Sequence, residues 1–147
     1  MLILTLPTAA EQLIVSTAAV VTPAAPLFYP PAEIAAFDWL NTHAPSQAIV
    51  LAGFNTGNAL SARTNLRAFL GHGVETLYAE QKRALVADFF NDTKTLADIQ
   101  TPDEYPIQYV MYGPDEAASS TPGALGRWSK SLTLMYNQDG YAIYRVQ

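Results

Sequence analysis

A short uninterrupted apolar run, Ala48-Ile-Val-Leu-Ala52, constrains the fold more than any other feature of the chain. It comes soon after Pro31 to His43, where apolar residues recur every three positions; this spacing predicts a helix, and Pro45 ends it. An apolar run that closely follows a helix is typical of a strand buried on both faces, as in a parallel sheet. The pattern therefore predicts an α/β domain.

The alternation of helix and strand continues through the rest of the chain. The next predicted elements are a helix over residues 58–62 and a strand over 67–70. A longer helix is predicted over 77–90, with Thr76 as its N-cap and with Leu77, Leu85 and Phe89 buried. A shorter helix capped by Asp92 or Thr93 and a strand over 107–112 follow. Residues 113–130 are rich in Gly, Pro, Ser and Ala, which predicts one long loop. Two strands, over 132–136 and 141–146, flank a four-residue turn and predict a hairpin.

These elements together predict a three-layer α/β sandwich. The central sheet is mixed and mainly parallel, helices cover both of its faces, and the C-terminal antiparallel hairpin lies at one edge. Its interior strands should include Ile49 to Leu51 and Tyr109 to Met111. Trp39, on the helix that leads into the first strand, should be largely buried.

The first 30 residues differ in composition from residues 31–147, which are long enough for a single domain with its own core. Glu11 is their only charged residue; with Thr8 it has capping-box spacing, and this predicts a helix over 9–20 followed by an extended arm. Prolines and polar residues interrupt every window long enough to span a bilayer, and a signal peptide would need a basic start. The alternative is a remnant of a preceding membrane-proximal segment, in which case Met1 is not the natural start.

Composition excludes several classes of function. Half of the residues are hydrophobic and 14% are charged, which excludes disorder, and a net charge of -5 disfavours nucleic acid and anionic bilayers as partners. The chain has no cysteine and only two histidines, so neither a thiolate site nor a paired-histidine metal site is expected. Glycine-rich phosphate loops and a nucleophile elbow are also missing, so we expect no cofactor and assign no catalytic residue.

One candidate ligand site follows from the predicted topology, because ligands of open α/β sheets bind beyond the carboxyl ends of parallel strands. The polar side chains expected at those ends are Asn55, Thr56, His72, Glu75 and Asp115. An imidazole between two glycines can exchange a proton, and nearby carboxylates can tune it. The alternative is that the glycines only form turns and the polar residues only cap helices.

Tyrosines are frequent in the predicted strands and leave a second question open. They can pack on the faces of the sheet, which is the commoner role, or they can stack against sugar rings. The residues concerned are Tyr109, Tyr112, Tyr136, Tyr141 and Tyr144.

Several segments, in this order and spacing, resemble a known family. They are Ala35-Ala-Phe-Asp-Trp-Leu-Asn-Thr-His-Ala-Pro, Ala48-Ile-Val-Leu-Ala-Gly-Phe-Asn-Thr-Gly-Asn, Phe69-Leu-Gly-His-Gly-Val-Glu-Thr, Tyr109-Val-Met-Tyr-Gly-Pro-Asp-Glu and Tyr141-Ala-Ile-Tyr-Arg-Val. They resemble the soluble C-terminal domain of multi-spanning bacterial GT-C glycosyltransferases, which use lipid-phosphate-linked sugars. The similarity extends from about Pro30 to Val146.

The resemblance implies a non-catalytic accessory domain at the extracytoplasmic face of the cell membrane, because in that family the catalytic acidic residue belongs to the membrane part. The implied partners are the transmembrane part of the parent protein and a glycan or lipid-phosphate sugar. Residues 1–30 would then derive from the last membrane helix. The alternative is a free-standing ligand-binding or enzymatic α/β domain that uses the edge containing His72.

Overall fold

A computed structural model of the chain describes residues 28–74, 76–100, 106–122, 124–128 and 130–147, apart from the side chain of Leu125. The chain divides into two units, Met1–Pro30 and Pro31–Gln147, and the fold below is that of the second unit. The helix predicted over residues 9–20 lies outside the described residues.

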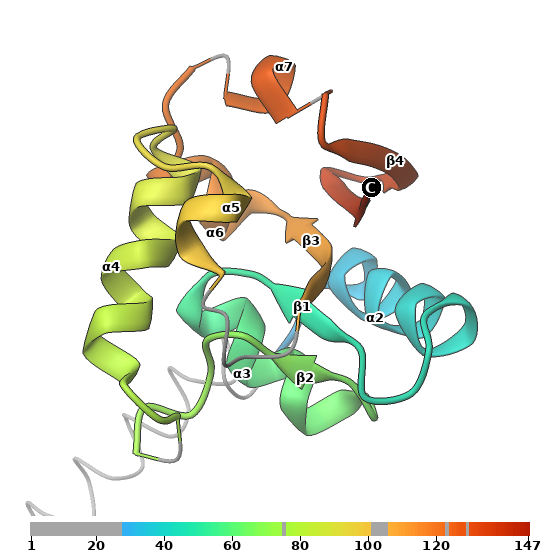
Figure 1. The fold of residues 1–147 in the computed structure, drawn as a ribbon. Coiled ribbons are helices and arrows are strands. Elements are labelled where there is room, and N and C mark those ends of the chain that lie inside the picture. Colours follow the sequence, from blue (N-terminus) through green and yellow to red (C-terminus); the bar gives the residue numbers. More distant parts are fainter. Residues whose placement is uncertain (1–27, 75, 101–105, 123, 129) are drawn as a thin grey trace, which may run out of the picture. The chain divides into compact units, whose positions relative to one another are not determined.

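A mixed five-stranded sheet forms the centre of the second unit, in the order β2-β1-β3-β5-β4 (Figure 1). The strands are β1 (Ile49–Leu51), β2 (Arg67–Ala68), β3 (Ile107–Tyr112), β4 (Leu132–Gln138) and β5 (Tyr141–Val146). The first three strands are parallel, and β5 pairs antiparallel with both β3 and β4. The α/β class, the interior positions of β1 and β3 and the hairpin at one edge are therefore confirmed.

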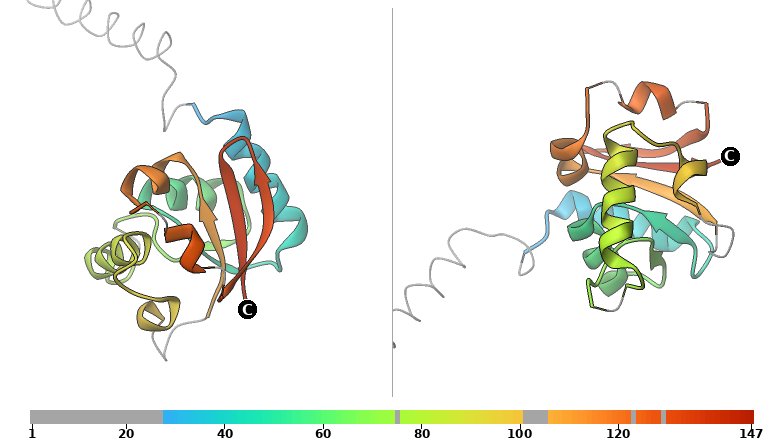
Figure 2. Two further views of the ribbon diagram at one scale, coloured as in Figure 1. Left: turned by 90° about the horizontal axis from the view of Figure 1, so that it is seen from above. Right: turned by 60° about the vertical axis from the view of Figure 1, so that its left-hand side comes forward.

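Helices cover both faces of the sheet (Figure 2). They are α2 (Pro31–His43), α3 (Phe54–Arg63), α4 (Ala79–Phe90), α5 (Leu96–Ile99), α6 (Pro114–Ser119) and α7 (Ala124–Trp128). Figures 1 and 2 show α2 and α3 on one face and α4, α5 and α7 on the other. In α2, Pro31 takes the first helical position, where its missing N–H costs nothing.

The main hydrophobic core lies between the sheet and α4, α5 and α7. Trp128 is buried there against Phe89, with ring centroids 4.7 Å apart and nearly parallel planes. Phe90 meets the same indole edge-on, at 5.8 Å. Three large aromatic side chains in mutual contact contribute much of the apolar area that stabilises this layer.

Residues 113–130 contain two short helices, so the prediction of one long loop is wrong. Pro114 at the first helical position and Glu116 three residues after the N-cap Gly113 give α6 a regular start. Trp128, at the end of α7, is held by the core. The Gly, Pro and Ser residues around these helices and their short length concealed both of them, and tertiary packing stabilises them.

The start of α4 also differs from its prediction. The helix begins at Ala79, and its N-cap is Tyr78 in the left-handed region (φ 57°) in place of Thr76. Leu77 consequently precedes the helix and is exposed, whereas Phe89 is buried as predicted. Sequence periodicity predicted the helix, but it carried no signal for a tyrosine with positive φ.

Other boundaries shift by a few residues. Helix α3 extends over Phe54–Arg63, longer than predicted; β2 ends at Ala68; and Thr95 caps α5 in place of Asp92 or Thr93. Strand β4 runs to Gln138, so the hairpin turn consists of Asp139 and Gly140, both with positive φ as in a type I′ turn.

Trp39 is partly buried and not exposed, which agrees with the prediction. The buried face of α2 consists of Glu33, Ala36, Phe37 and Leu40, at helical spacing. Trp39 lies beside this face and stacks on His43, with ring centroids 4.4 Å apart.

Candidate functional site

The carboxyl ends of β1 and β3 meet at the point where the strand order reverses, which is the usual ligand position in an open α/β sheet. The side chain of Glu116 occupies this point and is fully buried. Its Oε1 accepts the N–H of Gly53 after β1 at 2.8 Å, and its Oε2 accepts the N–H of Gly113 after β3 at 2.9 Å. A carboxylate of the chain itself thus binds the backbone donors that a ligand anion would use.

Glycine is required on both sides of this carboxylate. A Cβ at Gly53 would lie 2.9 Å from Oε1 of Glu116, and a Cβ at Gly113 would lie 2.6 Å from the Tyr141 ring. The two loops therefore close tightly around Glu116, and the glycines serve this close approach.

The structure joins two of the residues predicted for this edge. The Asn55 amide, at the start of α3, donates to Oδ2 of Asp115 in α6 at 3.1 Å, and both residues are exposed. Thr56 is buried. The His72 side chain is exposed, and no hydrogen bond of its imidazole occurs among the described residues; Glu75 lies outside them.

Sequence reasoning missed Glu33, the carboxyl group with the most unusual electrostatics. It is buried in the first turn of α2. Its pKa is raised from 4.5 to about 7, mainly by burial and then by the negative charges of Glu116 and Asp115, while the positive charge of Arg63 lowers it in part. Its spacing from Phe37 and Leu40 was the available signal, because all three share one helix face.

Tyr141, at the start of β5, interacts electrostatically with Glu33, Asp115 and Glu116, and we call these four residues the strand-end cluster. Burial, followed by the charges of Glu33, Asp115 and Glu116, raises the pKa of its hydroxyl to about 12. The cluster therefore holds one carboxyl that titrates near neutral pH beside a phenol that stays protonated. Among the described residues, no three His, Asp or Glu side chains are arranged to hold a metal ion.

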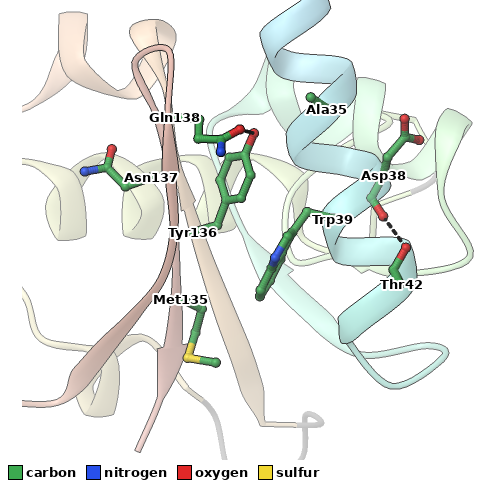
Figure 3. A pocket seen from close by; sticks show the side chains of 8 residues that line it. All are labelled: Ala35, Asp38, Trp39, Thr42, Met135, Tyr136, Asn137 and Gln138. Atoms are coloured by element: carbon green, nitrogen blue, oxygen red, sulfur yellow. Dashed lines mark hydrogen bonds between the residues drawn. The ribbon is translucent and has the colours of Figure 1, made fainter.

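A shallow open groove lies on another part of the surface, between α2 and the end of β4 (Figure 3). It encloses about 580 Å³ and is lined by Ala35, Asp38, Trp39, Thr42, Met135, Tyr136, Asn137 and Gln138. The Trp39 and Tyr136 rings point into it from opposite sides, with centroids 5.8 Å apart and planes inclined by 43°. Among the predicted strand tyrosines, Tyr136 thus lines a groove together with a second aromatic ring, that of Trp39.

A third feature is the exposed apolar segment between β2 and α4. Val74 is fully exposed, and Leu77 and Tyr78 are 68% and 63% exposed. We call these three residues the apolar loop. Two cations lie on aromatic rings nearby in the chain, Lys82 over Phe69 at 4.7 Å and Arg83 over Phe54 at 4.3 Å.

The position of the apolar loop is fixed at its base. A Cβ on Gly73 would touch the Phe54 ring at 3.7 Å, so the backbone beside Val74 rests on the ring that carries Arg83. The backbone N–H of Thr76 donates to the His72 carbonyl at 2.7 Å and closes the turn.

Nothing in the described part of the chain is a membrane-spanning helix, because no helix there is both long and apolar enough. No family model matches the sequence, and no curated protein matches it either.

Proposed function

We propose that the chain is a non-catalytic extracytoplasmic accessory domain of a membrane glycosyltransferase. It packs on the membrane part of the parent protein and shapes the access of the acceptor or of the lipid-linked sugar donor. The proposal joins the resemblance stated above to the surface features of the fold.

The apolar loop is the observation that carries this proposal. Soluble monomers rarely expose adjacent large apolar side chains, and such groups mark surfaces that contact a protein or a membrane. Val74, Leu77 and Tyr78 lie within five residues on a loop held by Phe54, and Lys82 and Arg83 follow in the first turns of α4. Exposed apolar side chains followed by basic residues are suited to contact with a protein surface that lies close to lipid phosphates.

The strand-end cluster supports the non-catalytic part of the proposal. Glu116 occupies the ligand position of the fold with two hydrogen bonds to backbone donors. A substrate anion would have to displace a buried carboxylate that is already satisfied, which is costly. The alternative, an enzymatic or ligand-binding domain at the edge containing His72, has less support because the described hydrogen bonds join Asn55 to Asp115 and leave out the imidazole.

The reading frame upstream of Met1 provides the first test. We expect it to continue into several hundred residues of hydrophobic spans, and a stop codon directly upstream would contradict the proposal. A second test uses the purified domain with polyprenyl-phosphate sugars and acceptors, where we expect no turnover. Turnover that His72→Ala abolishes would establish the alternative.

The apolar loop is then tested in the full reading frame. Val74→Asp with Leu77→Asp should lower sugar transfer by the parent protein, because the charges prevent apolar contact with the membrane part. Leu134→Asp is the matched control, since Leu134 is 50% exposed on β4 and lies outside the apolar loop. Equal transfer by both variants would argue against docking through the loop.

A further inference from the structure

We propose that the groove between α2 and the end of β4 binds a neutral sugar ring of a glycan. The choice of a glycan as the biological ligand rests on the proposed function, whereas the site itself is argued from its own residues. Its test is independent of docking through the apolar loop.

The shape of the groove suits a small ring. It is lined by one face of α2, at positions 35, 38, 39 and 42, and by four consecutive residues of β4, 135–138. Its volume of about 580 Å³ falls within the usual range for small-molecule sites. Both walls are regular secondary structure, so the lining side chains are held by a helix and a paired strand.

An aromatic surface forms the centre of the groove. The Trp39 and Tyr136 centroids are 5.8 Å apart, whereas a sugar ring between two aromatic rings would need about 7–8 Å at ordinary carbon contact distances. A sugar ring therefore does not fit between Trp39 and Tyr136, and it must contact the two rings from the open side of the groove. His43 stacks on the Trp39 indole, so it occupies one face of that ring, and its Nδ1 hydrogen-bonds to the Trp39 backbone carbonyl at 2.8 Å.

Polar side chains of the groove come from both walls, Asp38 from α2 and Gln138 from β4, whereas the Asn137 side chain projects from the opposite side of β4 (Figure 3). Asp38 contributes a carboxylate, and Gln138 contributes an amide that both donates and accepts. The Tyr136 hydroxyl already donates to Oε1 of Gln138 at 3.3 Å, which orients both side chains. A ring with apolar C–H faces and a hydroxyl rim is complementary to this combination.

The charge of the groove selects a neutral ligand. Asp38 is the one charged residue among the eight that line it, and no Lys, Arg or His is among them. A phosphate or a uronate would meet a carboxylate without a compensating cation. The sugar bound here is therefore not the phosphate-linked end of a lipid carrier.

The experiment uses the two tryptophans of the chain as internal probes. Trp39 lines the groove, and Trp128 is buried in the core, so a ¹H–¹⁵N spectrum gives one indole signal from each environment. Methyl α-mannoside, methyl β-glucoside and N-acetylglucosamine are titrated separately into the protein, with glucuronate as the charged comparison. We expect at least one neutral sugar to shift the Trp39 signal, with Kd on the order of 1–10 mM, and to leave Trp128 unmoved.

Variants distinguish the site from non-specific effects. Gln138→Ala removes an exposed amide on the groove side of β4 and should weaken binding by about fivefold without unfolding the domain. Tyr136→Ala should abolish binding, and Tyr78→Ala, which removes an exposed tyrosine from the apolar loop, should leave it unchanged. The loss caused by Tyr136→Ala counts only if the variant retains the wild-type spectrum elsewhere.

Three results would overturn the inference. One is an unmoved Trp39 signal with every neutral sugar at its solubility limit. Another is binding that Gln138→Ala and Tyr136→Ala leave intact, and the third is equal binding of glucuronate. None of these results bears on docking through the apolar loop, and failure of the loop variants in the full reading frame would leave sugar binding standing.

Discussion

The strand-end cluster and the apolar loop depart from the usual distribution of side chains in opposite directions. The cluster buries the carboxyl groups of Glu33 and Glu116, and the loop exposes Val74 and Leu77. The chain itself satisfies Glu116 through two backbone hydrogen bonds, whereas the described residues provide no cover for the two loop side chains. A buried polar group with partners points to a structural role, and an exposed apolar group without cover points to a contact outside the described residues.

Within the strand-end cluster, Glu116→Gln is the variant with the largest expected effect. The glutamine offers one acceptor oxygen and an NH₂ group, so one of the two N–H groups, of Gly53 or Gly113, faces a donor in a buried site. We expect the free energy of unfolding to fall by about 2–4 kcal/mol, measured by urea denaturation.

Asp115→Asn is the control for Glu116→Gln. It changes the adjacent, exposed carboxyl of the same helix and keeps an oxygen for Asn55, so the expected change is below about 1 kcal/mol. Equal stability of Glu116→Gln and the wild type would show that the carboxylate does not hold the two loops together.

Glu33→Gln should alter how stability depends on pH. The folded protein holds the Glu33 proton up to a pKa of about 7, against an ordinary value of 4.5, so the folded state binds more protons between these two pH values. The stabilisation is complete below pH 4.5 and is lost as pH rises through 7. Above pH 7 the variant, which mimics the protonated form, should be more stable than the wild type by about 1–2 kcal/mol, since solvent screens part of the charge.

Denaturation series from pH 4 to pH 8 measure this difference, with Glu80→Gln as a control that removes an exposed glutamate from α4. A constant difference between Glu33→Gln and the wild type across the series would contradict the raised pKa of Glu33.

Much of the fold could be predicted because periodicity and turn chemistry are local signals. The helix over 31–43, the strand over 107–112 and the C-terminal hairpin all have clear patterns and limits in the sequence. The two short helices within 113–130 lack such a pattern. They form because tertiary contacts of residues such as Trp128 stabilise them, and the local sequence does not reveal these contacts.

The candidate site could be predicted only in part. Topology predicted that strand ends converge, and Asn55 does meet Asp115. Topology did not indicate which carboxyl group lies deepest, so it missed Glu116 and Glu33, whose burial depends on how α2 and α6 pack around the two glycine loops. The groove was missed because it needs Trp39 and Tyr136 from elements far apart in the chain.

The smallest expected effect on stability concerns the apolar loop, and a matched pair of leucines makes it measurable. Leu70 is 1% exposed in the core, and Leu77 is 68% exposed in the loop seven positions later. Leu70→Ala should cost about 2–5 kcal/mol of unfolding free energy, because it removes buried methyl groups and leaves a cavity. Leu77→Ala should change it by less than about 0.5 kcal/mol in the isolated domain, since the side chain stays largely in water when the chain folds. Thermal or urea denaturation of both variants measures the contrast. A cost for Leu77→Ala near that of Leu70→Ala would show that Leu77 is covered by this chain, and the comparison between loop and cluster would then fail.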